Sequence, residues 1–115
     1  MEGMPDRKYL LDRLGAAVVA TDADGIIVYL NRAGEDLFAK YGPPESLLGR
    51  NLADCHKPET MIRIKEMYDS FKNGDRRPRF YVRENEKGKR TVVQVPVYDG
   101  DELEGVMEFI LSGAP

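Results

Sequence analysis

The spacing of apolar residues changes at Gly74, and this change limits the possible folds more than any other feature of the sequence. Before Gly74, residues 58–73 carry apolar side chains every three or four positions, behind a proline that suits the first helical position. After it, residues 79–84, 91–98 and 103–111 read as strands separated by turns. The sequence therefore predicts a long amphipathic helix followed by three antiparallel strands in a meander.

The first part of the chain predicts a hairpin that passes directly into a helix. Apolar runs at residues 16–21 and 26–30 flank Asp22-Ala23-Asp24-Gly25, and Asp and Gly are residues that a tight turn favours. Asn31 follows the second run and is typical of a helix N-cap. Gly42-Pro43-Pro44 ends that helix, because proline cannot supply the next backbone donor.

The predicted elements define an α+β fold, a five-stranded antiparallel sheet with helices packed on one face. One or two single helical turns are expected within residues 45–57, and a short amphipathic helix over residues 5–14. A length of 115 residues fits one domain. We assign residues 1–15 to an N-terminal flanking helix, 16–112 to the domain and 113–115 to a tail.

Composition excludes several classes of protein. Apolar residues make up 42% of the chain and charged residues 32%, which argues against disorder of the whole chain. The net charge of −3 gives no overall attraction for nucleic acid, and no apolar run is long enough to span a membrane. A single cysteine cannot form an internal disulfide, and the N-terminus lacks a secretion signal. We expect a cytoplasmic protein that binds neither nucleic acid nor membranes.

Residues 19–38 resemble the opening of PAS sensory domains, in which an apolar strand, Asp-x-x-Gly, a second strand, Asn and a helix follow one another. Leu48-Gly49-Arg50-Asn51 is similar to the Ile-Gly-Lys/Arg step that comes next in that family. Residues 95–100 and 105–109 resemble its last two strands, so the likeness covers roughly residues 6–111. The order and spacing of these motifs carry the resemblance, since each motif alone is loose.

The resemblance implies a non-catalytic sensory module with a curved sheet and a pocket under the long helix. Such domains are commonly dimeric and coupled to kinases, cyclases or transcription regulators. We therefore predict a signal-transduction domain of the bacterial two-component type that binds a small molecule, forms a homodimer, or does both. A signalling output domain or partner protein is expected. The alternatives are an association module without ligand and a haem sensor.

The resemblance and the helical spacing together predict which residues line a pocket or an interface. The expected pocket residues are Phe38, Leu52, Cys55, His56, Met61, Ile64, Met67, Tyr68, Phe80 and Val95. The apolar stripe of the long helix can instead be ordinary core. The expected dimer surface is the apolar face of the N-terminal helix, formed by Tyr9, Leu10, Leu11 and Leu14. That face can alternatively pack on the sheet of its own chain.

His56, the only histidine, is the sharpest candidate for cofactor chemistry. A neutral imidazole can bind haem iron axially or titrate near neutral pH, or it can simply hydrogen-bond the backbone at a helix start. Similar haem sensors carry the axial histidine inside the long helix, whereas His56 precedes Pro58. We expect no cofactor, with haem as the open alternative.

Other cofactor and catalytic chemistry is not expected. Covalent haem of the c type is excluded because Leu52 stands where Cys-x-x-Cys-His needs its first cysteine. Flavin adduct chemistry of the related photosensors needs Gly-Arg-Asn-Cys, and the chain reads Gly49-Arg50-Asn51-Leu52. One cysteine and one histidine cannot close a zinc site alone, and no serine lies in a nucleophile elbow. We predict no metal and no enzyme activity.

Residues 76–90 have a local basic bias. They hold seven positive residues against Glu84 and Glu86. This run can attract an acidic partner or nucleic acid. The preferred interpretation is a solvated sheet edge whose charges prevent aggregation.

Overall fold

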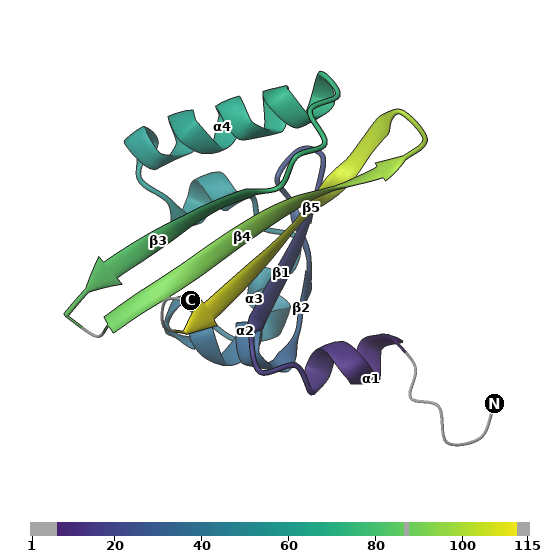
Figure 1. Cartoon of the computed structure of the whole chain (residues 1–115). Coiled ribbons are helices and arrows are strands. Elements are labelled where there is room, and N and C mark those ends of the chain that lie inside the picture. Colours follow the sequence, from purple (N-terminus) through teal and green to yellow (C-terminus); the bar gives the residue numbers. More distant parts are fainter. Residues whose placement is uncertain (1–6, 87, 113–115) are drawn as a thin grey trace, which may run out of the picture.

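The structure, a computed structural model, describes residues 7–86 and 88–112 and contains one five-stranded antiparallel sheet (Figure 1). The strands are β1 (Ala17–Asp22), β2 (Ile27–Leu30), β3 (Arg79–Asn85), β4 (Gly88–Asp99) and β5 (Glu102–Ser112). The helices are α1 (Arg7–Asp12), α2 (Arg32–Leu37), α3 (Pro44–Leu47) and α4 (Pro58–Lys72), with 3₁₀ turns η1 (Ala39–Tyr41) and η2 (Leu52–Cys55). The predicted α+β class and the order of elements are confirmed.

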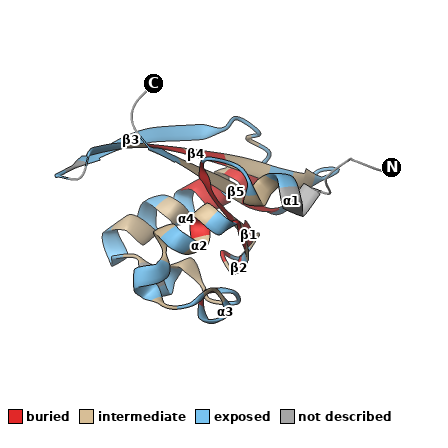
Figure 2. Ribbon diagram, turned by 90° about the horizontal axis from the view of Figure 1, so that it is seen from below, coloured by how far each residue is buried: buried red, intermediate tan, exposed pale blue. Residues whose placement is uncertain are grey.

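The sheet brings the two ends of the domain together. Its strand order is β2-β1-β5-β4-β3, so the last strand lies between the first strand and the rest of the meander. In the register, Val19 of β1 faces Glu108 of β5, which faces Gln94 of β4. The helices α2, α3 and α4 lie on one side of this sheet (Figures 1 and 2).

The two faces of the sheet follow from this register and from strand alternation. Val19 and Val106 belong to the core clusters under the helices, so the residues that pair with them in register share that inner face. By alternation, Glu108, Gln94 and Tyr81 are also on the inner face. Residues between these positions point to the opposite, outer face.

The predicted hairpin turn is present and is closed by the first aspartate. Asp22 Oδ1 accepts hydrogen bonds from the backbone N–H of Asp24, at 2.9 Å, and of Ile26, at 3.0 Å. Gly25 has a φ of +83°, which a residue with a side chain rarely adopts. Asn31 caps α2 as expected, but that helix ends at Leu37 and continues only as the turn η1.

The long helix α4 has the predicted limits and packs on the sheet through one stripe. Pro58 occupies its first turn, and Gly74 beyond its end has a φ of +96°. Met67, Tyr68 and Phe71 are buried and form a core cluster with β5 side chains. A second core cluster lies under α3 and the hairpin and consists of Val19, Ile27, Leu30 and Leu47. Figure 2 shows the buried residues between the sheet and the helices.

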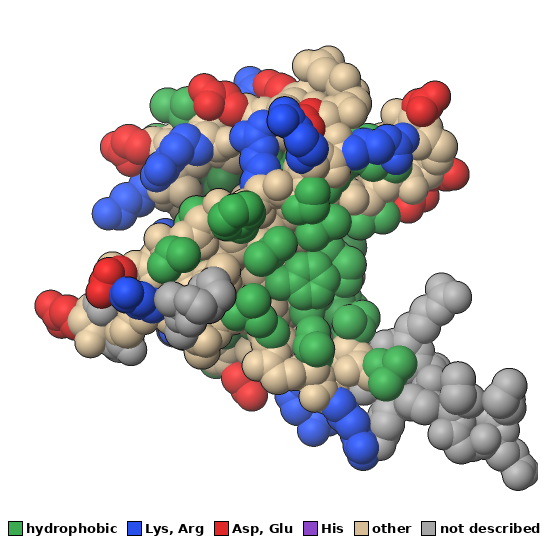
Figure 3. Space-filling model, viewed as in Figure 1, with side chains coloured by type: hydrophobic (Ala, Val, Ile, Leu, Met, Phe, Trp, Pro, Cys, Tyr) green, Lys and Arg blue, Asp and Glu red, His purple; other side chains and the backbone are tan. Residues whose placement is uncertain are grey.

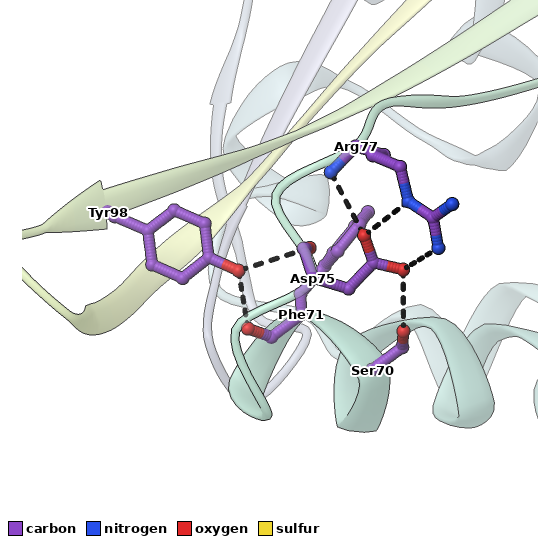
Figure 4. A network of polar contacts seen from close by, with 5 residues as sticks. All are labelled: Ser70, Phe71, Asp75, Arg77 and Tyr98. Carbon is purple, nitrogen blue, oxygen red and sulfur yellow. Dashed lines mark hydrogen bonds and ion pairs between the residues drawn. The ribbon is translucent and has the colours of Figure 1, made fainter.

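A polar network fastens the end of α4 to the sheet (Figure 4). Tyr98 of β4 donates its hydroxyl to the carbonyl oxygens of Phe71 and Asp75. The Asp75 carboxylate accepts two hydrogen bonds from the Arg77 guanidinium, at 2.9 and 3.1 Å, and one from Ser70, at 3.3 Å. The hydrogen bonds from the Arg77 side chain and backbone hold the pKa of Asp75 well below its usual range. The helix exit is therefore held by side chains of α4, of the loop that follows it and of β4.

No helix in the described part of the chain is long and apolar enough to cross a membrane.

Candidate functional site

A groove of about 490 Å³ opens along one flank of α4. Its walls come from three segments, which are the β1–β2 turn, the start of η2 and α4 itself. The lining residues are Ala23, Asp24, Gly25, Asn51, Leu52, Pro58, Met61, Ile62, Ile64, Lys65, Tyr68, Asp69 and Lys72. A volume in this range matches that of many small-molecule sites.

The groove is apolar within and charged at its rim. Leu52, Ile64 and Tyr68 lie against the core cluster beneath α4, so they form its inner wall. Lys72 and Asp24 stand on opposite sides of the opening, with Nζ and Oδ1 4.0 Å apart. Both side chains are largely exposed, so this ion pair contributes little to stability. The arrangement suits an apolar molecule with polar groups at its exposed end.

Tyr68 links the groove to the sheet. Its hydroxyl hydrogen-bonds the Thr21 hydroxyl of β1, and both residues are buried. Burial raises the pKa of Tyr68 to about 12, although the Thr21 hydrogen bond opposes this shift. Tyr68 therefore remains a neutral hydroxyl at physiological pH and serves as a hydrogen-bonding group inside the fold.

A second polar region lies on the inner face of the sheet, around Glu108 at the centre of β5. Gln94 is its cross-strand neighbour on β4. Burial raises the pKa of Glu108, while the charge of His56, a hydrogen bond from the Gln94 side chain and the charge of Arg83 oppose this shift. Burial also raises the pKa of Tyr81 on β3, and Glu108 adds to this shift. These polar groups thus interact electrostatically in an otherwise apolar layer. They come from the end of η2 and from β3, β4 and β5.

The outer face of the sheet carries a broad apolar surface, which we term the outer patch. Its members are Phe80, Val82, Val93, Val95, Val97, Met107, Phe109 and Leu111, which alternate with the inner-face residues on β3, β4 and β5. Phe80 is 75% exposed and Val82 is 52% exposed. Figure 3 shows hydrophobic side chains gathered on this side of the molecule. An exposed apolar surface of this kind marks an interaction site more often than chance.

The family model of the PAS fold matches residues 6–110 of the sequence. The chain belongs to the PAS fold family. The C-terminal domain of a Streptococcus mutans protein has a similar structure, with a TM-score of 0.76 and 23% identity, over 91% of this chain and 81% of that one. Comparison with curated proteins gave no match.

Two further solved structures are also similar in fold. The PAS domain of Bordetella pertussis BvgS has a TM-score of 0.72 and 20% identity, over 94% of this chain and 84% of that one. A sensory box sensor histidine kinase from Vibrio cholerae has a TM-score of 0.65 and 20% identity, over 92% of this chain and 87% of that one. At these identities the likeness is one of fold. PAS domains are generally sensory modules, and several occur in histidine kinases.

The structure brings four of the expected pocket residues of this PAS domain together. Leu52, Met61, Ile64 and Tyr68 line the groove. Met67 is instead buried in the core beneath α4, because its direction on the helix points at the sheet. That these side chains bind a ligand remains a prediction.

Three expected pocket residues lie elsewhere. Phe80 and Val95 are on the outer face, so the expectation that they line the pocket is wrong. The period of two identified their strands but not which face is covered, because β4 has apolar residues on both faces. Phe38 packs on the core cluster under α3, away from the groove.

His56 follows the groove wall in sequence without lining the groove. The Nδ1 atom of His56 lies 2.8 Å from the carbonyl oxygen of Leu52, which matches the backbone hydrogen bond that was the alternative to haem ligation. Haem ligation by His56 stays the open alternative to the prediction of no cofactor. The Cys55 side chain lies outside the described residues.

The N-terminal helix has the expected exposed leucines. Leu10 is 57% exposed and Leu14 is 41% exposed, whereas Leu11 is half-buried. The Tyr9 side chain lies outside the described residues. A dimer through this face remains a prediction.

Sequence reasoning missed Glu108, Gln94 and the outer patch. Gln94 and Glu108 break the apolar runs of two strands at positions that share a face once β4 and β5 are paired. Two polar residues that interrupt neighbouring apolar strands could have predicted this pair, because an isolated polar residue on a covered sheet face needs a hydrogen-bonding partner.

Proposed function

We propose that this PAS domain is the sensory part of a signalling protein and that it binds a small, mainly apolar molecule in the groove beside α4. The supporting observation is the groove of about 490 Å³ with Leu52, Met61, Ile64 and Tyr68 in its wall. The presence of similar domains in sensor histidine kinases supports a proposed output through a kinase or another partner protein.

The proposed signal is a change in the preferred position of α4 relative to the hairpin turn. A molecule in the groove contacts both α4 and the β1–β2 turn, so it favours the arrangement in which the two walls fit it. Tyr68 passes that preference to β1 through its bond to Thr21. The ligand shifts the equilibrium only as far as its affinities for the two arrangements differ.

The neutral fluorescent probe N-phenyl-1-naphthylamine tests the groove. We expect saturable binding to the wild type and a loss of affinity of about tenfold or more in Met61→Trp, whose indole fills the groove. Glu66→Trp is the matched control, because Glu66 is exposed on α4 and does not line the groove. Equal binding by both variants would contradict the proposal. Native mass spectrometry of the purified protein then identifies any molecule already bound.

A second proposed function is homodimer formation through the outer patch. The observation that favours it is the exposure of large apolar side chains on three adjacent strands, with Phe80 75% exposed and Val82 52% exposed. A second copy supplies the same apolar surface, as a two-fold interface requires. The exposed Leu10 of α1 and Leu14, two residues beyond the end of α1, can extend it.

Sedimentation velocity tests the dimer. We expect Phe80→Glu to weaken dimerisation by about a hundredfold or more, because it buries a charge in an apolar interface. Ile62→Glu is the control, since Ile62 is 62% exposed but lies on α4. A wild-type monomer at high micromolar concentration would overturn the dimer and leave the groove proposal standing.

A further inference from the structure

Three arginines from three elements lie around the open inner side of β3 and β4. Arg83 and Arg90 are direct cross-strand partners on the inner face. Arg83 acts electrostatically on Tyr81 and on Glu108, and Arg63 of α4 acts on Tyr81. Two like charges directly opposite one another in a sheet oppose pairing of the strands. The sheet therefore holds an unfavourable pair of cations at this position.

None of the three arginines has an ion-pair partner among the described residues. The ion pairs within 4.0 Å in that part of the chain are Lys72–Asp24, Arg76–Asp101 and Arg77–Asp75. The acidic group that faces Arg83 from the covered part of the sheet is Glu108, and burial shifts its pKa upward, toward the neutral form. The local charge of the region is thus positive.

A neighbouring neutral group can also donate a hydrogen bond. The Tyr81 hydroxyl shares the inner face with Arg83 and Arg90. Tyr81 is 42% exposed, so this side of the sheet is open to solvent there. Further along the face, Val92 is buried and the Gln94 side chain already hydrogen-bonds Glu108. The exposed part of the region thus combines a hydroxyl donor and positive charge with the ring of Tyr81.

We propose that the inner face of β3 and β4 binds a small organic anion, a carboxylate or a phosphate monoester, between Arg83, Arg90 and Arg63. A guanidinium matches the two oxygens of such a group with two parallel hydrogen bonds. The bound anion also removes the repulsion between Arg83 and Arg90. The apolar part of the molecule rests on the exposed ring of Tyr81.

This anion site is distinct from the groove of the proposed function. The groove uses Met61, Lys65 and Tyr68 on one flank of α4, toward the β1–β2 turn. At 100° per residue, Arg63 points about 160° away from the middle of that flank. Its charge acts on Tyr81 of β3. The two sites can be occupied, and can fail, independently.

Titration of ¹⁵N-labelled protein with benzoate, phenyl phosphate and benzylamine at constant ionic strength tests the proposal. We expect saturable amide shifts centred on residues 81–83 and 90–94 with one or both anions and none with benzylamine. The comparison of benzoate with phenyl phosphate decides which anion is preferred. Absence of saturable shifts with both anions, or equal shifts with benzylamine, would overturn the site. Shifts confined to the groove residues would overturn it while leaving the groove proposal intact.

Charge-neutral variants separate a built site from general attraction. We expect Arg83→Gln and Arg90→Gln each to weaken anion binding by about tenfold. Lys89→Gln removes the same charge one residue away on the outer face, opposite Glu84, and is expected to change affinity less than twofold. Without ligand, Arg83→Gln is expected to raise the melting temperature by about 2–5 °C, because it relieves the like-charge pair. Equal weakening by Lys89→Gln would reduce the site to a diffuse basic surface and refute the proposal.

Discussion

Asn31 joins three segments of the domain through one side chain. It is fully buried, and its Oδ1 accepts hydrogen bonds from the backbone N–H of Val18 and of Gly34, both at 2.8 Å. Its Nδ2 donates to the carbonyl oxygens of Leu11 and Ala16, both at 2.9 Å. The side chain thus holds the end of α1, the start of β1 and the first turn of α2.

Asn31→Ala is expected to lower the free energy of unfolding by about 2–4 kcal/mol, because it leaves several buried backbone groups without partners. Urea unfolding followed by circular dichroism measures this loss. Asn51→Ala is the control, since the two hydrogen bonds of Asn51 are exposed to solvent, and we expect a loss of about 1 kcal/mol or less. Similar losses for both variants would show that Asn31 acts only as a helix cap.

Gly105 is required by the close approach of two strands. A Cβ at this position would lie 2.0 Å from the carbonyl oxygen of Thr21, a backbone atom that cannot move without breaking the pairing of β1 with β5. We expect Gly105→Ala to destabilise the fold by about 2 kcal/mol or more. Gly15→Ala meets nothing within 4 Å and is expected to be neutral in the same urea experiment. A stable Gly105→Ala protein would contradict this packing.

At the scale of elements, α4 is fixed differently at its two ends. The groove runs along α4 from Pro58 to Lys72, but only the exit of the helix is fastened by Tyr98, Asp75 and Arg77. Arg76 adds to this by stacking 4.0 Å from the centre of the Tyr98 ring. If α4 moves when a ligand binds, we therefore expect the movement to be larger near Met61 than near Phe71.

The hydrogen bonds at the exit of α4 predict that the stability of the fold depends on pH. The hydrogen bonds from Arg77 keep the pKa of Asp75 below its unfolded value, so its contribution to stability is present above about pH 4. This contribution is lost as the pH falls through the lower pKa that Asp75 has in the folded state. We expect Asp75→Asn to lower the urea midpoint at pH 7 and to match the wild type more closely at pH 2. Asp101→Asn, at an exposed ion pair, serves as the control and is expected to change little. A constant difference between pH 7 and pH 2 would contradict this account.

At the scale of the whole molecule, the pairing of β1 with β5 joins the ends of the chain. Residues 17–22 pair with residues 105–110, so the central ladder forms only when most of the chain is in place. Such long-range pairing makes folding cooperative, and the last amides to exchange are those of the most protected strands.

Hydrogen exchange measures this cooperativity. We expect the amides of β5 and of the β1 residues paired with it to exchange most slowly, near the rate set by global unfolding. The amides of α1 are expected to exchange fastest among the helices, because α1 lies at the edge of the domain (Figure 1) and its Leu10 is exposed. Faster exchange in β5 than in β3, an edge strand, would contradict the central role of the β1–β5 ladder.

Local sequence signals account for most of the elements. The Asp22 turn, the Asn31 cap and the interval from Pro58 to Gly74 were all readable, because each depends on hydrogen bonds or backbone angles within a few residues. Only one wall of the groove could be predicted from the sequence. Its α4 wall follows from helical spacing, whereas the part formed by Ala23–Gly25 depends on where the hairpin lies in space.

The sequence by itself determined which segments become helices and strands, since periodicity and capping act within one element. Tertiary structure alone decided that β5 lies beside β1, which face of β4 is covered, and hence that Val95 faces outward while Gln94 and Glu108 face the helices. The physical reason is that alternation along a strand defines two faces equally well. Only packing against α4 makes one of them the inside.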